Sequence, residues 1–255
     1  DGLMSETQTL LKIAGYTDTG LRREYNQDHI GFDQELGIAV LADGMGGHKA
    51  GEIAAHMAVK FVLDKLRKFV LQENSVSITG SQLLEFVSNT ISSSNAEIYS
   101  AQEAEEAYKG MGTTIVATVV IGSQIYVGHV GDSRLYLYRN RTVQRLTKDH
   151  SLVQDLIDRG FYTEREARSA SVGHVVTRAL GTRPEVEVDA NEEPLQAYDL
   201  LLLCSDGLTD MVSDWQIAEV IDENIADLEV AAKKLIALAN HYGGKDNISV
   251  ILMQT

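Results

Sequence analysis

Apolar residues recur along the chain with two different spacings, which separate predicted helices from predicted strands. From Gly51 onward they recur at steps of three and four residues, as in a helix with one buried face. A second helix of this kind is predicted from Ser81 to about Ala107. Further helices are expected at Ser151–Arg159, Thr163–Ser169, Asp214–Asp222 and Leu228–Tyr242.

Short runs of β-branched and apolar residues, separated by turn-length gaps, predict antiparallel strands. They are expected at Leu10–Tyr16, Gly37–Ala42, Thr113–Ile121, Gln124–Val130, Leu135–Arg139, Thr142–Leu146, Leu200–Ser205 and Asn247–Met253, with another strand after Asp28. The long helices come in adjacent pairs between these blocks of strands rather than alternating with single strands. This order favours an α+β domain in which helices cover the faces of antiparallel sheets.

Composition excludes several classes of protein. The 255 residues suffice for one large domain or two small ones, and the net charge is −15. Such an acidic chain suits neither a nucleic acid nor an anionic membrane surface, and no apolar run reaches the roughly 18 residues of a membrane span. The single cysteine, Cys204, excludes an internal disulfide and a cysteine-rich zinc site, and it favours a cytoplasmic location.

The organisation expected is a single domain over residues 10–255, preceded by an N-terminal extension over residues 1–9. The extension lacks the basic and apolar regions of a signal peptide, and Met4 within it could be the natural start. No linker and no internal repeat is evident.

Five aspartates stand at predicted strand ends, most of them beside glycine, and they carry the candidate chemistry. They are Asp28, Asp43, Asp132, Asp206 and Asp246. Converging carboxylates repel one another unless cations lie between them, and oxygen ligands without histidine or cysteine clusters favour Mg²⁺ or Mn²⁺ over zinc. A single Asp-Gly pair is more simply an ordinary turn. Five aspartates in this arrangement favour a metal site.

Seven short motifs then stand in the order seen in a known family. They are Arg23 to Asp28 (REYNQD), Asp43 to His48 (DGMGGH), Gly110 to Thr114 (GMGTT), Gly131 to Arg134 (GDSR), Thr177 to Gly181 (TRALG), Ser205 to Gly207 (SDG) and Gly244 to Asn247 (GKDN). From about Ile13 to Met253 the sequence resembles the metal-dependent protein phosphatases of type 2C, in their bacterial serine/threonine branch. The resemblance implies an α–β–β–α sandwich of two antiparallel sheets flanked by paired helices.

The resemblance also implies a set of ligands for two or three Mn²⁺ or Mg²⁺ ions. Asp43 would bridge two ions, and the Gly44 carbonyl would bind the second. The first ion would also be held by Asp206 and Asp246. Asp28 would hold metal-bound water, and Asp132, with Asp206, would hold a third ion.

Two further residues are candidates for catalysis. Arg23 matches the arginine that grips the substrate phosphate, and its planar fork fits two phosphate oxygens. Met45 stands where eukaryotic relatives carry a histidine, so His48 is the candidate proton donor, although it could equally be structural. The other histidines have no clustered partners in the sequence, and most are expected at the surface or in packing roles. Asn247 is expected to orient its neighbours, and Cys204 is expected to pack within its strand.

The segment of about 147–181 looks like the flap that bacterial relatives place beside the active site. Relatives often carry His-Pro shortly before the threonine-arginine motif, where this chain has Ala170 and Ser171. This departure bears on flap conformation and substrate choice.

The function predicted is hydrolysis of phosphoserine and phosphothreonine in proteins, by in-line attack of a water or hydroxide that bridges the metals. A serine/threonine kinase whose products the enzyme reverses is the expected partner, and a monomer is the expected state. Two alternatives stay open: a relative that binds phosphoproteins without turnover, and a phosphoesterase for small phosphates.

Overall fold

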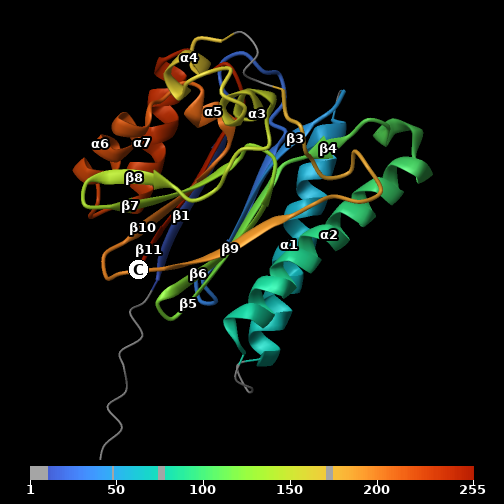
Figure 1. Cartoon of the computed structure of the whole chain (residues 1–255), viewed down its shortest axis with the longest axis horizontal. Coiled ribbons are helices and arrows are strands. Elements are labelled where there is room, and N and C mark those ends of the chain that lie inside the picture. Colours follow the sequence, from blue (N-terminus) through green and yellow to red (C-terminus); the bar gives the residue numbers. More distant parts are fainter. Residues whose placement is uncertain (1–10, 48, 74–77, 171–174) are drawn as a thin grey trace, which may run out of the picture.

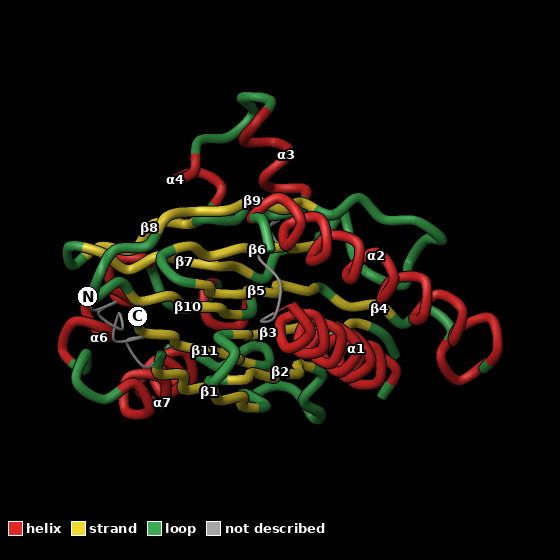
Figure 2. The backbone as a smooth tube through the Cα atoms, turned by 90° about the horizontal axis from the view of Figure 1, so that it is seen from below, coloured by secondary structure: helices red, strands yellow, loops and turns green. Residues whose placement is uncertain are grey.

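Two antiparallel sheets pack face to face, and helices cover both outer faces (Figures 1 and 2). The computed structural model describes residues 11–47, 49–73, 78–170 and 175–255. The predicted N-terminal extension lies outside the described residues. The layering confirms the predicted α–β–β–α sandwich.

Each sheet draws strands from both halves of the chain. In the described residues one sheet has the order β1 (Lys12–Asp18), β11 (Ile248–Gln254), β10 (Leu200–Cys204), β7 (Arg134–Arg139) and β8 (Thr142–Arg145). The other has the order β2 (Asp28–Asp33), β3 (Ile38–Met45), β5 (Ile115–Ile121), β6 (Gln124–Val130) and β9 (Asp189–Pro194), with the short β4 (Gly112–Thr113) also paired to β3. Because β1 and β11 are antiparallel neighbours, residues near the two ends of the described chain meet.

Three apolar layers hold the sandwich together. The pair α1 (Ala50–Glu73) and α2 (Gly80–Ala104) covers the β3 sheet, and the pair α6 (Asp214–Glu223) and α7 (Leu228–His241) covers the β10 sheet. Strand β3 shows how both faces of a sheet are used: Val40 packs toward α1, whereas Leu41 packs toward the other sheet, and both are fully buried. A strand buried on both faces is continuously apolar, as the run Gly37–Ala42 is.

Among the described residues, three short α-helices lie at one end of the sandwich (Figure 1). They are α5 (Asp206–Thr209), directly after β10, and α3 (Leu152–Asp158) and α4 (Glu164–Ala167) within the 147–181 segment. Helices α3 and α4 project beyond the sheets, whereas α1, α2, α6 and α7 lie along them (Figure 2). None of the helices among the described residues is long and apolar enough to cross a membrane.

The sequence pattern missed some elements and misplaced others by a few residues. Strand β9 and helix α5 were not predicted; β9 reads DANEEP, and its polar composition does not signal a strand. Helix α2 ends at Ala104 rather than near Ala107, because Glu105 is extended and a 3-10 turn, η1 (Glu106–Tyr108), follows.

Candidate functional site

The predicted aspartates come from five separate segments that end at one end of the sandwich. Asp28 begins β2, Asp43 lies near the end of β3, and Asp132 lies in the loop from β6 to β7. Asp206 begins α5 after β10, and Asp246 precedes β11. Asp28 and Asp43 are direct cross-strand partners, so their side chains leave the sheet side by side.

The carboxyl group of Asp28 is the most deeply buried of the set. Its Oδ2 accepts hydrogen bonds from Ser249 Oγ at 2.6 Å and from Ser205 Oγ at 2.9 Å. Its Oδ1 is buried and has no hydrogen-bond partner among the described atoms. Burial raises the pKa of Asp28 to about 7, although both serines lower it, and the charge of Asp206 raises it further.

Asp43 is fixed through its backbone. Its N–H donates to Thr114 Oγ1 at 3.0 Å, and its carbonyl accepts from the Thr114 N–H at 2.9 Å. The Thr114 hydroxyl also meets Ser133 Oγ at 2.7 Å, next to Asp132. The sequence predicts only a strand over Thr113–Ile121 and gives no signal that Thr114 links two of the predicted metal ligands.

Gly44 lies where only a glycine fits. A Cβ at this position would come within 1.9 Å of the Gly51 carbonyl oxygen and 2.6 Å of the Gln27 carbonyl oxygen. The Gly44 N–H also donates to that Gln27 carbonyl at 3.0 Å. This close packing holds the backbone next to Asp43 against the start of α1.

Four of the aspartates form one electrostatic cluster. Burial raises the pKa of Asp43 well above its ordinary value, and the charges of Asp28, Asp206 and Asp132 raise it further. Burial likewise raises the pKa of Asp132. The charge of Asp206 raises this pKa further, and the guanidinium of Arg134 lowers it. In the described part of the chain these four carboxyl groups therefore destabilise one another when ionised.

A divalent cation among these oxygens would remove the conflict. The donors are carboxylate oxygens, which suit hard cations such as Mg²⁺ and Mn²⁺, and one buried oxygen of Asp28 has no protein partner. The residues present thus fit the predicted metal centre.

Arg23 and Asp246 form an ion pair with each other. Arg23 Nη2 lies 2.9 Å from Asp246 Oδ2, and the two side chains are 54% and 31% exposed. Exposed pairs of this kind contribute at most about 1 kcal/mol, so an anion could take the guanidinium from Asp246. The fold therefore brings the predicted phosphate-binding arginine to one of the predicted ligands, Asp246.

Asn247 fixes the loop that carries Arg23. Its Nδ2 donates to the Thr19 and Tyr25 carbonyls, each at 2.9 Å, and its Oδ1 accepts from the Gln27 N–H at 2.9 Å. All three partners lie between β1 and β2, so Asn247 holds this loop in place; its orienting role beside Asp246 stays a prediction.

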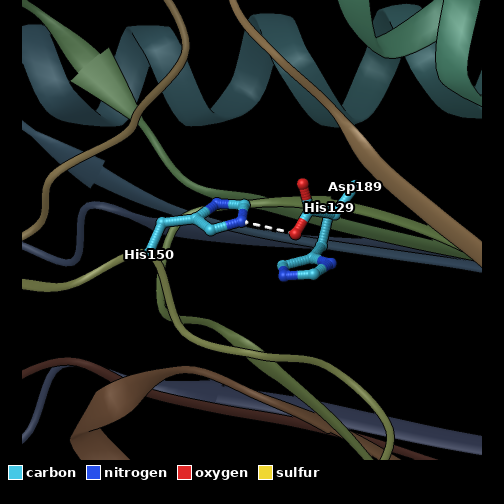
Figure 3. Close-up of side chains that lie close together, drawn as sticks. All are labelled: His129, His150 and Asp189. Carbon is cyan, nitrogen blue, oxygen red and sulfur yellow. Dashed lines mark hydrogen bonds and ion pairs between the residues drawn. The ribbon is translucent and has the colours of Figure 1, made fainter. Parts of the chain in front are cut away.

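The histidines were only partly anticipated. His48 lies outside the described residues. The expectation that the remaining histidines have no clustered partners is wrong for four of them: His29 contacts His56 edge-on, and His129 stacks on His150. His129 and His150 are buried and lie close to Asp189 (Figure 3). Lone histidines far apart in the sequence gave no spacing signal for this group.

Comparison with known proteins adds a family to this geometry. The family model described as protein phosphatase 2C matches residues 21–241. The chain is 39% identical over 241 residues to the serine/threonine phosphatase stp of Listeria monocytogenes, an alignment that covers 93% of each chain.

Solved structures give the same result. The Mycobacterium tuberculosis serine/threonine phosphatase PstP/Ppp superposes with a TM-score of 0.85 at 36% identity, covering 96% of this chain and 98% of that one. The catalytic domain of PstP in complex with two manganese ions superposes with a TM-score of 0.81, also at 36% identity, covering 96% and 97%.

Proposed function

The chain belongs to the protein phosphatase 2C family, and from this premise we propose that it hydrolyses phosphoserine and phosphothreonine in proteins with divalent metal ions. The observation that carries the proposal is the cluster of Asp28, Asp43, Asp132 and Asp206. Burial and the charges of neighbouring carboxylates raise the pKa of the first three, and cations would relieve this conflict. The ions proposed are Mn²⁺ or Mg²⁺, as in the manganese complex of PstP.

We assign the ligands by their place in the fold. Asp43 would bridge two ions, the Gly44 carbonyl would bind one of them, and Asp206 and Asp246 would bind the other. Asp28 would orient water through the oxygen that has no protein partner. Asp132 and Asp206 would hold a third ion, since the charge of Asp206 acts directly on Asp132 and raises its pKa.

When bound, two such ions supply a water that ionises near neutral pH and neutralise the charge of the phosphate. The protein residues do the rest. Ligand carboxyl groups release their protons as cations bind, because the cation favours the charged form. Arg23 would exchange its contact with Asp246 for two phosphate oxygens and so orient the phosphorus for in-line attack.

His48 stays the predicted donor of a proton to the leaving serine or threonine oxygen. The 147–181 segment, in which α3 and α4 project beyond the sheets, is the proposed flap that contacts the protein substrate. Four further points also stay predictions: a cognate serine/threonine kinase, a cytoplasmic location, a monomeric state and a single domain over residues 10–255.

Phosphate release from a phosphothreonine peptide tests the proposal. We expect turnover with Mn²⁺, none with excess chelator, and a loss of about 100-fold or more in kcat for Asp206→Asn, because removal of even an outer partner of a metal site costs 10- to 100-fold. The matched control is Asp64→Asn, which removes an exposed carboxylate on α1 and should leave kcat unchanged.

Two results would overturn the assignment. A wild-type protein that binds Mn²⁺ and retains the phosphopeptide without releasing phosphate would be a binding protein. A protein that hydrolyses small phosphate esters but leaves phosphopeptides and phosphoproteins intact would be a small-molecule phosphoesterase.

A further inference from the structure

His150 joins the base of the proposed flap to the loop that carries Asp132. The two arms of the 147–181 segment pair at this residue, since the Thr177 N–H donates to the His150 carbonyl at 3.0 Å. His150 then binds Gly131 twice. Its N–H donates to the Gly131 carbonyl at 2.9 Å, and its ring Nδ1 accepts from the Gly131 N–H at 3.0 Å. Gly131 directly precedes Asp132 in the sequence.

The hydrogen bonds of the ring fix its tautomer. Because Nδ1 accepts from Gly131, it carries a lone pair, and the proton of the neutral ring lies on Nε2. Nε2 then donates to Asp189 Oδ2 at 2.9 Å (Figure 3), and the cationic guanidinium of Arg178 also lies close, with Nη1 3.1 Å from Nε2. The other oxygen of Asp189 accepts from Arg178 Nη1 at 2.9 Å. Arg178 lies in the second arm of the flap segment, so Asp189 ties both arms to β9.

This group could also be read as a metal site. His129, His150 and Asp189 offer ligand atoms within 4.8 Å of one another, and Nδ1 of His129 is buried with no hydrogen-bond partner among the described atoms. However, a metal bound to His150 Nε2 would replace the proton that Nε2 donates to Asp189. Nδ1 would still have to accept the hydrogen bond from the Gly131 N–H. Both ring nitrogens would then need lone pairs, as in an imidazolate. The hydrogen bonds present favour a protein-only clamp.

We propose that His150 is a positioning residue: held by Asp189 and Arg178, it fixes the Gly131–Asp132 turn to the base of the flap. The position of Asp132 and the position of the flap then depend on each other. This inference rests on the proposed function, because it assigns Asp132 to a metal ion. Loosening the clamp should weaken the ion held by Asp132 and leave the ions held by Asp43 and Asp246 in place.

Two substitutions separate the two halves of the ring. In His150→Asn the amide oxygen stands near the place of Nδ1 and can still accept from Gly131. In His150→Gln the amide nitrogen stands near the place of Nε2, so of the two side-chain bonds only the one to Asp189 is kept. The backbone bond to the Gly131 carbonyl survives in both variants. His241→Gln changes an exposed histidine at the end of α7 and is the control.

The measurement is calorimetric titration of the full chain with Mn²⁺, alongside kcat and KM at each Mn²⁺ concentration. We expect His150→Gln to weaken the weakest Mn²⁺ binding step about 10-fold or more while the tighter steps stay unchanged. His150→Asn should stay within about 3-fold of the wild type, since the Gly131 bond survives. The control should match the wild type.

The outcomes separate this inference from the proposed function. A wild type that neither binds Mn²⁺ nor releases phosphate contradicts the proposed function itself. A working wild type with an unchanged Mn²⁺ titration in His150→Gln overturns the positioning role, even if that variant unfolds earlier. Binding of Zn²⁺ that is abolished by His129→Asn would show a metal site in place of the clamp.

Discussion

At the scale of single residues, small polar side chains hold the aspartates of the site in position. Ser205 and Ser249 hold one oxygen of Asp28, and Thr114 holds the backbone of Asp43. Asn247 satisfies three backbone groups of the loop that carries Arg23. These small polar side chains leave the second oxygen of Asp28 without a protein partner. The hydrogen-bond donors of Ser205 and Ser249 thus hold one oxygen of Asp28 in place, and its other oxygen is left for the proposed ions.

Gly44 gives the sharpest single-residue prediction. In Gly44→Ala the new Cβ would meet two backbone carbonyl oxygens at 1.9 and 2.6 Å, and neither can move without shifting α1 or β2. We expect a loss of stability of about 3 kcal/mol, at the upper end of the usual cost of overpacking, together with a loss of metal-dependent turnover. Urea denaturation and phosphate release check both.

The control for this prediction is Gly47→Ala, three residues away. A Cβ at Gly47 would have no heavy atom within 4 Å, so stability and turnover should stay near those of the wild type. Equal losses in both variants would show that the glycine turn as a whole, rather than the packing of Gly44, is what the site needs.

At the scale of secondary-structure elements, the helices that cover the sheets are kept in place by their ends as well as by their apolar faces. Helix α7 begins after Asp227, whose side chain accepts from the N–H groups of Glu229 and Val230. Its buried face includes Leu228, Leu235 and Ile236. This helix packs on β1 and β11, and β11 begins directly after Asp246 and Asn247.

Removal of the Asp227 cap should lower stability and leave catalysis unchanged. Asp227→Ala should lower the free energy of unfolding by about 1 kcal/mol, because two N–H groups lose their acceptor. Asp227→Asn keeps an acceptor oxygen and should lose less. Neither variant should change kcat at saturating Mn²⁺, since Asp227 lies at the start of α7 and Asp246 beyond its end. A fall in kcat in the stable, folded Asn variant would contradict this view.

The elements also show how far the sequence could predict the fold. Strand β6 was predicted with its observed bounds, because its apolar run stands between Gly122-Ser123 and the Gly131 turn. Strand β9 was missed because it pairs with β6 along only one edge and its polar side chains stay hydrated, so no apolar pattern marks it. The carboxylate cluster followed from aspartates at strand ends. The contact of His150 with Asp189 could not be predicted from the sequence. Asp189 reaches the two histidines only because β9 pairs with β6, and no apolar pattern marks β9.

At the scale of the whole molecule, the net charge affects how readily a charged substrate approaches. The net charge is −15, so a phosphopeptide with acidic neighbours is repelled until it reaches the proposed ions. The attraction that the ions supply is local, whereas the repulsion is long-ranged. The two therefore respond differently to salt.

Salt dependence follows from this contrast. Between about 10 mM and 150 mM NaCl the screening length falls from roughly 30 Å to 8 Å. At saturating Mn²⁺, KM for a phosphothreonine peptide with acidic flanks should fall over this range, whereas KM for one with basic flanks should rise. Steady-state kinetics on the two peptides check this. Parallel changes in both KM values would show that the net charge does not steer substrate.

The last prediction concerns the stability of the metal-free protein. The pKa of Asp28 is raised from 3.8 to about 7 in the folded chain, and those of Asp43 and Asp132 are raised as well. Between about pH 4 and 7 the folded state therefore holds protons that the unfolded state has lost, so the free energy of unfolding falls as pH rises through this window. With chelator, the urea midpoint should be lower at pH 7.5 than at pH 5.5.

Mn²⁺ should reverse most of this loss, because it replaces the protons with cations and binds only the folded state; at 100 times its dissociation constant it adds about 2.7 kcal/mol. Two histidines act in the opposite direction. Burial lowers the pKa of the partly buried His29 and the buried His129 and so favours stability at higher pH. The variant Asp28→Asn isolates the carboxylates: its midpoint should depend less on pH than that of the wild type. An unchanged pH dependence in this variant would mean that Asp28 is already ionised in the metal-free fold.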